Sequence, residues 1–262
     1  MPRLLVPMLV ALASTLGIEC DHQTPTQPAN VPANQPASSA ATSTQPPAAS
    51  LGVASKTPEF DPHDFVRVVD NRLFPLRPGT RFIYKGEEDA EPERVVTDVT
   101  HDEKTILGVK VVVVLDRVYM SGELKEKTLD WYAQDKRGNI WYFGEDSKEY
   151  EDGEVVSTAG SWEAGKDGAR AGIIMPAHPH VGQVTQQEFA AGVAEDMARV
   201  LHLGLKVSVP YGSFHACVET EEFTPLEPGT KEVKFYCPRI GFVKARDVSG
   251  GTAHIALTKI IP

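Results

Sequence analysis

The 262-residue chain lacks the short motifs that mark nucleotide and iron–sulfur chemistry. It contains no Gly-x-Gly-x-x-Gly segment, no phosphate-binding loop and no Cys-x-x-Cys pair, which are patterns that cradle a pyrophosphate or ligate a cluster. It also lacks the Gly-x-Ser-x-Gly elbow of one large class of hydrolases. We therefore expect no nucleotide cofactor and no cluster, and binding is a stronger expectation than catalysis.

Positive charge is also scarce. The chain has 26 Lys and Arg against 36 Asp and Glu, a formal net charge of −10, and no basic run. Because nucleic-acid binding depends on clustered positive charge, we expect no nucleic-acid partner.

Long apolar runs are confined to the start of the chain. The segment MPRLLVPMLVALASTLGIEC (1–20) has one Arg, an apolar run and then small residues, which is the pattern of a secretory signal. The apolar run is shorter than the roughly 20 residues that a membrane-spanning helix needs. We predict an exported protein, located in the periplasm or at the cell surface.

Cysteine is limited to three residues, and Cys20 ends the predicted signal. Bacterial lipoprotein signals place a small residue before the lipidated cysteine, whereas Glu19 stands there in this chain. The odd number of cysteines favours lipidation, because the two remaining cysteines can form a disulfide and leave Cys20 unpaired. Two outcomes stay open: a lipid anchor on Cys20, which would be the only membrane attachment, or cleavage after Ala13.

Charged residues are absent between Gln23 and Ser55, where Pro, Ala, Thr, Ser, Gln and Asn dominate. Such a segment cannot bury enough apolar surface to offset the entropy of ordering it. We predict a disordered linker over residues 21–59, followed by a single β-rich domain over residues 60–262.

Turn signals recur about every ten residues in that domain, between runs rich in Val, Ile, Tyr, Phe and Trp, which predicts antiparallel hairpins. The dipeptide Ser121-Gly122 suits a two-residue loop that sets Met120 opposite Glu123. Extending this register predicts four pairs across the hairpin: Arg117–Glu126, Asp116–Lys127, Val112–Trp131 and Val114–Leu129.

The segment DWYAQDKRGNIWYFGED (130–146) extends the sheet through a turn at Asp135–Gly138. Its rings divide between two faces, with Trp131, Trp141 and Phe143 on one. A sheet with one solvent-exposed face should be apolar on the other face only. Because aromatic residues occupy both faces here, either another part of the chain covers each face or one face forms a concave ligand-binding surface. The residues predicted to contact a ligand are Tyr132, Ile140 and Tyr142.

Two further features bear on the fold. Setting Phe223 opposite Lys231 places Cys217 across from Cys237, which predicts a disulfide in an exported protein. The segment 187–200 has apolar residues at helical spacing but ends that suit strands, so two bent strands and a short helix both remain open. The fold class is all-β or β-rich α+β, with one curved, half-barrel-like antiparallel meander.

The segments LFPLRPGTRFIYKG, VSVPYGSFHACVET and FYCPRIGFVKA resemble the opening and closing strands of a family of uncharacterised exported bacterial proteins, often lipoproteins. The resemblance covers Asn71 to Asp247 and includes the Pro-x-x-Gly turn at residues 238–241. More loosely, the pattern is similar to the LolA/LolB-like lipoprotein carriers. That likeness would imply a strongly bent sheet over one or more helices, with lipid in the concavity.

Two chemical alternatives remain. His178 and His180 share one side of an extended segment near Met175, so they could hold copper or zinc. A hydrolase would use paired carboxyls across a bond, but Glu145 and Asp146 are adjacent on a strand and point to opposite faces. We therefore expect no catalytic residue and no resident cofactor.

The sequence thus predicts a non-enzymatic exported envelope protein that binds an apolar or amphipathic ligand or another envelope component. A periplasmic metal-binding protein using His178 and His180 is the alternative, and an unrecognised hydrolase is third.

Overall fold

The computed structural model describes residues 60–262. The predicted signal (1–20), the lipidation site Cys20 and the predicted linker (21–59) lie outside these residues. The elements are the 3-10 turn η1 (Pro62–Asp64) and the strands β1 (Phe65–Val66), β2 (Arg81–Glu88), β3 (Glu91–Ile106), β4 (Val109–Met120), β5 (Glu123–Asp135), β6 (Ile140–Glu151), β7 (Glu154–Ser157), β8 (Trp162–Glu163), β9 (Arg170–Met175), β10 (Val184–Gln186), β11 (Glu188–Phe189), β12 (Met197–Val209), β13 (Gly212–Phe223), β14 (Lys231–Cys237), β15 (Gly241–Ser249) and β16 (His254–Ile261).

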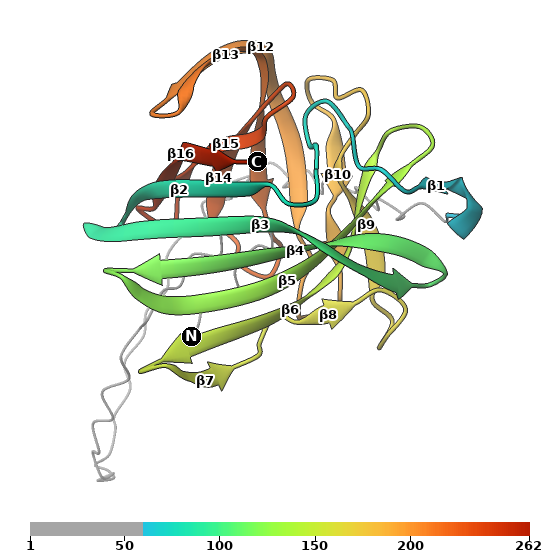
Figure 1. The fold of residues 1–262 in the computed structure, drawn as a ribbon, viewed down its shortest axis with the longest axis horizontal. Helices are drawn as coiled ribbons and strands as arrows, with labels where there is room; N and C mark the ends of the chain where they lie inside the picture. The colour runs from blue at the N-terminus through green and yellow to red at the C-terminus, as the bar shows by residue number, and fades with distance from the viewer. Residues whose placement is uncertain (1–59) are drawn as a thin grey trace, which may run out of the picture. The chain divides into compact units, whose positions relative to one another are not determined.

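One antiparallel sheet holds all of these strands and curls into a nearly closed barrel. Two meanders build it, β2 to β6 and β12 to β16, and the pairing of β16 with β2 joins them. Figure 1 shows β2 to β6 side by side, with the orange and red strands β12 to β16 above them. The strand order begins with β10 and ends with β9 and β11. β10 contacts β9, but among the described residues the two are not hydrogen-bonded neighbours. The curved antiparallel sheet predicted from the sequence is therefore confirmed, and it closes further than a half-barrel.

Two glycines allow the close approach of backbones that this closure needs. A Cβ on Gly86 would collide with the carbonyl oxygen of His254, where β2 meets β16. A Cβ on Gly172 of β9 would collide with the backbone of Gln187, the residue before β11. Glycine at these positions marks backbone contact rather than flexibility.

The β4–β5 hairpin turns where predicted but has a different register. Met120 faces Glu123 across Ser121 and Gly122. A bulge beside Tyr119 then shifts the pairing by one residue, so all four pairs predicted for this hairpin, charged and apolar, are wrong. The observed pairs are Arg117–Lys127, Asp116–Thr128, Leu115–Leu129, Val114–Asp130, Val113–Trp131 and Val112–Tyr132.

Other parts of the chain cover both faces of the β5–β6 hairpin, as expected for a hairpin with aromatic side chains on both faces. On the outer face, Phe60 and Phe65 pack edge-on against Trp141 and Phe143, with ring centroids 5.4 to 5.9 Å apart. The N-terminal segment of the domain is therefore the covering element on that side. The inner face lines the barrel, where Phe74 lies 5.4 Å from Tyr132.

Segment 187–200 contains the short strand β11, a turn and the start of β12, and no helix. Of the two alternatives for this segment, bent strands are therefore correct. The α-helical cover implied by the LolA/LolB-like resemblance is absent from residues 60–262. In this part of the chain no helix is long and apolar enough to cross a membrane.

Candidate functional site

A pocket of about 340 Å³ opens between β5, β6, β8 and the turns that flank β9 and β11. We call it the indole pocket, because two of the three tryptophans of the chain line it. Its size lies at the lower end of the range of small-molecule sites, about 300 to 1,000 Å³. Its lining residues are Trp131, Glu145, Ser161, Trp162, Glu163, Lys166, Asp167, Ala169, Ala190, Ala191 and Val193.

A bulge at Gly144 brings the pocket walls together. Gly144 has φ 125°, a conformation that glycine adopts far more easily than other residues. It pairs with Glu163, while Glu145 pairs with Trp162, so Glu145 and Trp162 face the same side. A Cβ on residue 144 would collide with the carbonyl oxygen of Trp162. The short strand β8 can therefore lie here only because residue 144 is glycine.

Neighbouring side chains fix both indoles. The Trp162 indole N–H donates to Glu188 Oε2 over 2.7 Å, and its ring lies edge-on against Tyr142 at 5.5 Å. The Lys104 ammonium lies 3.2 Å from the centre of the Trp131 ring. The pocket thus presents two aromatic walls whose orientation is set before any ligand arrives.

The charges around the pocket compensate one another. Glu163 accepts from Lys104 over 2.7 Å and from Lys166 over 2.9 Å. Although partial burial opposes it, these two lysines hold the pKa of Glu163 below its usual value, so it stays ionised. Asp167 supplies the second negative charge. Two cations and two anions therefore surround the pocket.

Glu145 contributes a carboxyl group of a different kind. Burial, together with repulsion from Asp130 and Glu126, raises the pKa of Glu145 well above its usual value. The Tyr142 hydroxyl lies between two carboxylates, 2.7 Å from Asp130 Oδ1 and 3.2 Å from Glu145 Oε2. The raised pKa favours the uncharged acid, which can both donate and accept a hydrogen bond.

Glu145 belongs to a larger set that we call the buried acidic cluster. Lys234 is the one lysine or arginine buried among residues 60–262, and it bonds Glu222 over 2.7 Å and Glu232 over 3.2 Å. One ammonium cannot balance so many carboxyl groups, and burial raises the pKa of most of them. The cluster comprises Glu88, Glu93, Asp116, Glu126, Asp130, Glu145, Glu188, Asp196, Glu222 and Glu232.

The pKa shifts within the cluster share one leading cause. Burial, assisted by repulsion from Glu88 and Glu232, raises the pKa of Glu93 to about 8. Burial likewise raises the pKa values of Glu126, Asp130 and Glu232 to about 7. For Lys234, burial alone would lower the pKa, but its two carboxylate partners more than offset this and raise it.

The three predicted ligand contacts are not among the residues that line the indole pocket. Tyr132, Ile140 and Tyr142 are fully buried, and the two tyrosine rings stack at 4.8 Å. Tyr142 supports the site, since it contacts both Trp162 and Glu145. Direct contact between these three residues and a ligand stays a prediction.

The predicted metal ligands are spread between core and surface. Met175 is 1% exposed at the end of β9, while His178 and His180 are exposed in the loop that follows. Among the described residues, no group of three or more His, Cys, Asp or Glu side chains has the arrangement of a metal site. Copper or zinc binding by His178 and His180 stays a prediction.

Glu145 and Asp146 point to opposite sides, as expected for neighbours on a strand. Glu145 faces the pocket and the buried cluster, whereas Asp146 is half-exposed and bonds Lys148 over 2.8 Å. The adjacent carboxyls therefore do not form a catalytic pair.

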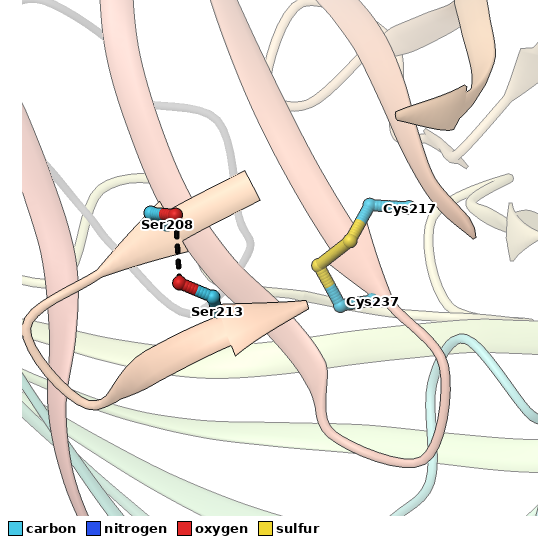
Figure 2. Close-up of a disulfide and its surroundings, with 4 residues drawn as sticks. All are labelled: Ser208, Ser213, Cys217 and Cys237. Atoms are coloured by element: carbon cyan, nitrogen blue, oxygen red, sulfur yellow. Dashed lines mark hydrogen bonds between the residues drawn. A yellow bond between two sulfur atoms is a disulfide. The ribbon is translucent and has the colours of Figure 1, made fainter. Parts of the chain in front are cut away.

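The disulfide between Cys217 and Cys237 is present, with Cα atoms 4.2 Å apart on β13 and β14. Figure 2 shows the two sulfur atoms bridging these strands, near the hydroxyl pair of Ser208 and Ser213 in the β12–β13 hairpin. Phe223 faces Lys231 in this ladder, which is the register that predicted the bridge.

Sequence reasoning missed Trp162, Glu188 and the acidic cluster. A signal was available for the cluster: Glu126, Thr128 and Asp130 alternate along β5, as residues on one strand face do. The bulge beside Tyr119 then sets Asp116 opposite Thr128 and so adds a β4 carboxyl group to the same face. Trp162 lies on a two-residue strand, which no periodicity can reveal.

The described residues thus define a nearly closed antiparallel β-barrel with a pocket at its side. No family model and no curated protein matches the chain. The chain is similar to a solved structure titled as a "putative lipoprotein" from Parabacteroides distasonis, at 12% identity. The match covers 73% of this chain and 99% of that one, with a TM-score of 0.41. A likeness this distant carries no argument about function, and none of the comparisons supports membership of the LolA/LolB-like carriers.

Proposed function

We propose that this is an exported, non-enzymatic envelope protein whose barrel binds a small uncharged amphipathic molecule in the indole pocket. The indole pocket itself carries the proposal: about 340 Å³ with two fixed indoles and one buried carboxyl group. Export rests on the signal pattern of residues 1–20.

The chemistry of the lining selects the ligand class. Indole faces stack on flat apolar surfaces, while Glu145 and Ser161 offer hydrogen bonds at the pocket wall. The surrounding charges cancel, so neither a cation nor an anion gains from entering. A molecule with an apolar face and a polar edge, such as a saccharide unit, matches this lining.

Tryptophan fluorescence tests the proposal on the exported full-length chain. Trp141 lies under Phe60 and Phe65, outside the pocket, so Trp141→Phe leaves only the two pocket indoles as reporters. We expect at least one member of a panel of mono- and oligosaccharides to shift the emission saturably. Charged analogues of the same size should bind more weakly.

A matched pair of substitutions separates the pocket from general surface effects. Val193 lines the pocket and is 36% exposed, while Val181 is 61% exposed and lies elsewhere. Val193→Phe should abolish the shift, and Val181→Phe should leave it unchanged. If both variants retain binding, or if no saccharide binds, the indole pocket is not the site.

Glu145→Gln distinguishes binding from hydrolysis. The amide resembles the uncharged acid that the pocket already presents, so binding should persist within about threefold, which is less than 1 kcal/mol. Turnover of a bound saccharide by the unmodified protein that Glu145→Gln abolishes would refute the non-enzymatic part of the proposal.

A further inference from the structure

A second hollow, away from the indole pocket, combines apolar walls with two guanidinium groups. It has a volume of about 220 Å³ and lies between the segment before β2, the tip of the β12–β13 hairpin, the turn before β15 and the end of β16. We call it the arginine groove. Its lining residues are Pro75, Arg77, Thr80, Phe82, Tyr211, Arg239, Ile240, Ile260 and Pro262.

The two arginines of the groove are available to a ligand. Arg77 and Arg239 are both exposed, and neither forms an ion pair with another side chain among residues 60–262. The lining contains these two cations and no Asp or Glu, on a chain whose formal net charge is −10. Guanidinium groups bind carboxylate and phosphate oxygens with paired hydrogen bonds, so the groove is complementary to an anion.

The walls select an apolar partner for that anion. Phe82, Ile240 and Ile260 line the groove together with Tyr211, which is 43% exposed. A narrower crevice of about 20 Å³ shares Phe82 and Ile240 with the groove and continues inward to Tyr84. The groove therefore suits a ligand with a charged end and a hydrocarbon body.

The backbone holds Arg239 in place at a conformational cost. Arg239 has φ 70°, in the left-handed region that glycine occupies far more easily. Its amide donates to the carbonyl oxygen of Arg72 over 2.6 Å, and Cys237, two residues earlier, is bridged to Cys217. Strained residues held by their surroundings often have a functional role.

We propose that the arginine groove binds a single-chain anionic amphiphile, with its carboxylate or phosphate head on Arg77 and Arg239 and its chain along Phe82, Ile240 and Ile260. The occupant is a dissolved monomer rather than the surface of a bilayer, because the groove is a hollow of limited volume. This site is separate from the indole pocket and does not depend on the function proposed for it.

Calorimetry on the full chain tests the proposal with four ten-carbon probes below their micelle concentrations: decanoate, decyl phosphate, decanol and decyltrimethylammonium. We expect saturable binding at one site for either or both anions, weakening as salt is added. Decanol should bind at least tenfold more weakly and the cationic probe not at all. The relative affinities of decanoate and decyl phosphate identify which head group the site prefers.

Three substitutions locate the site. Arg77→Gln should weaken anion binding at least tenfold. Arg94→Gln is the matched control, since Arg94 is also exposed and lies 4.1 Å from a tyrosine ring, on β3. Arg239→Gly should abolish binding while raising the melting temperature, because glycine relieves the backbone strain. A purely structural arginine would not separate binding from stability in this way.

Several outcomes would overturn the proposal. Equal affinity for decanol and decanoate would show an apolar site without charge recognition. Unchanged binding in both arginine variants would place the amphiphile elsewhere. Binding to anionic vesicles of phosphatidylglycerol without binding of the monomeric probes would identify a membrane-docking surface instead.

Discussion

Raising the pH should destabilise the barrel, because the buried acidic cluster must lose protons that it holds in the folded state. Glu93 is the clearest member, since it is 3% exposed and faces Glu88, Glu232 and Asp247. Its pKa rises from 4.5 to about 8 on folding. The folded state therefore binds a proton that the unfolded state has already released at neutral pH. The stabilisation is complete below pH 4.5 and is lost as the pH rises through about 8.

The size of the effect follows from the shift. Between pH 5 and pH 8, a carboxyl group with these two pKa values loses about 3 kcal/mol of unfolding free energy, since one pKa unit corresponds to about 1.4 kcal/mol. Glu126 and Glu232, both raised to about 7, act in the same direction. Because the groups interact, their contributions do not add independently. The expected total is thus at least as large as the contribution from Glu93 alone.

Urea unfolding at pH 5, 6.5 and 8, followed by tryptophan fluorescence with the disulfide intact, measures this dependence. The unfolding free energy should fall steadily from pH 5 to pH 8. Glu93→Gln should remove about 3 kcal/mol of that fall, because the amide does not titrate. Glu123→Gln is the control, since the Glu123 side chain is 72% exposed. Stability that is flat or rises over this range, or an unchanged slope in Glu93→Gln, would refute the reasoning.

Three further predictions concern individual contacts. Lys234→Met should lower the unfolding free energy by about 3 to 5 kcal/mol at pH 7, because it leaves Glu222 without its buried partner; adding Glu222→Gln should recover part of this loss in the same urea assay. Gly144→Ala should displace β8 and abolish saccharide binding in the fluorescence titration, with a folded circular dichroism spectrum retained. Replacing Cys217 and Cys237 by alanine should lower stability by about 2 to 4 kcal/mol, measured as a fall in melting temperature, because their bridge closes a loop of 20 residues.

The pairing of the strands could be predicted wherever turn chemistry fixed it. Ser121-Gly122 closes a two-residue hairpin as expected. The same reasoning on β13 and β14 located the disulfide, because no irregularity separates the Phe223–Lys231 pair from Val218–Tyr236. Local rules therefore succeed while the ladder stays regular.

The acidic cluster could not be predicted, because a single bulge reverses the faces of a strand. The bulge beside Tyr119 moves Asp116 from Lys127 to Thr128 and sets Asp130 opposite Val114. A one-residue slip sends every following side chain to the other face. The extra residue of the bulge is Lys125, between Leu124 and Glu126, and no glycine or proline there marks the irregularity. The predicted register therefore did not bring Asp116 onto the same face as Glu126 and Asp130.

The indole pocket escaped prediction for a related reason. The sequence pattern assigned Trp131 to the core and gave Glu145 no partner, and Trp162 reaches both from a strand of two residues. Gly144 was the available clue, since a glycine inside an apolar strand often marks a bulge or a close backbone approach. Such a glycine indicates that something approaches the strand, without identifying the partner.

Both proposed sites occupy places where the barrel departs from what stability alone would favour. Apolar residues could fill the space of a buried acidic cluster at lower cost, because carboxyl groups inside a barrel must be hydrogen-bonded or kept protonated. Glycine at position 239 would relieve the strain that Arg239 imposes on its turn. Sequences tend to break such local rules at functional positions, where another constraint outweighs stability. Arg239 is one of eight non-glycine residues with positive φ among residues 60–262, and it is the one that also lines the arginine groove. Binding assays should therefore begin at the acidic cluster behind Glu145 and at Arg239.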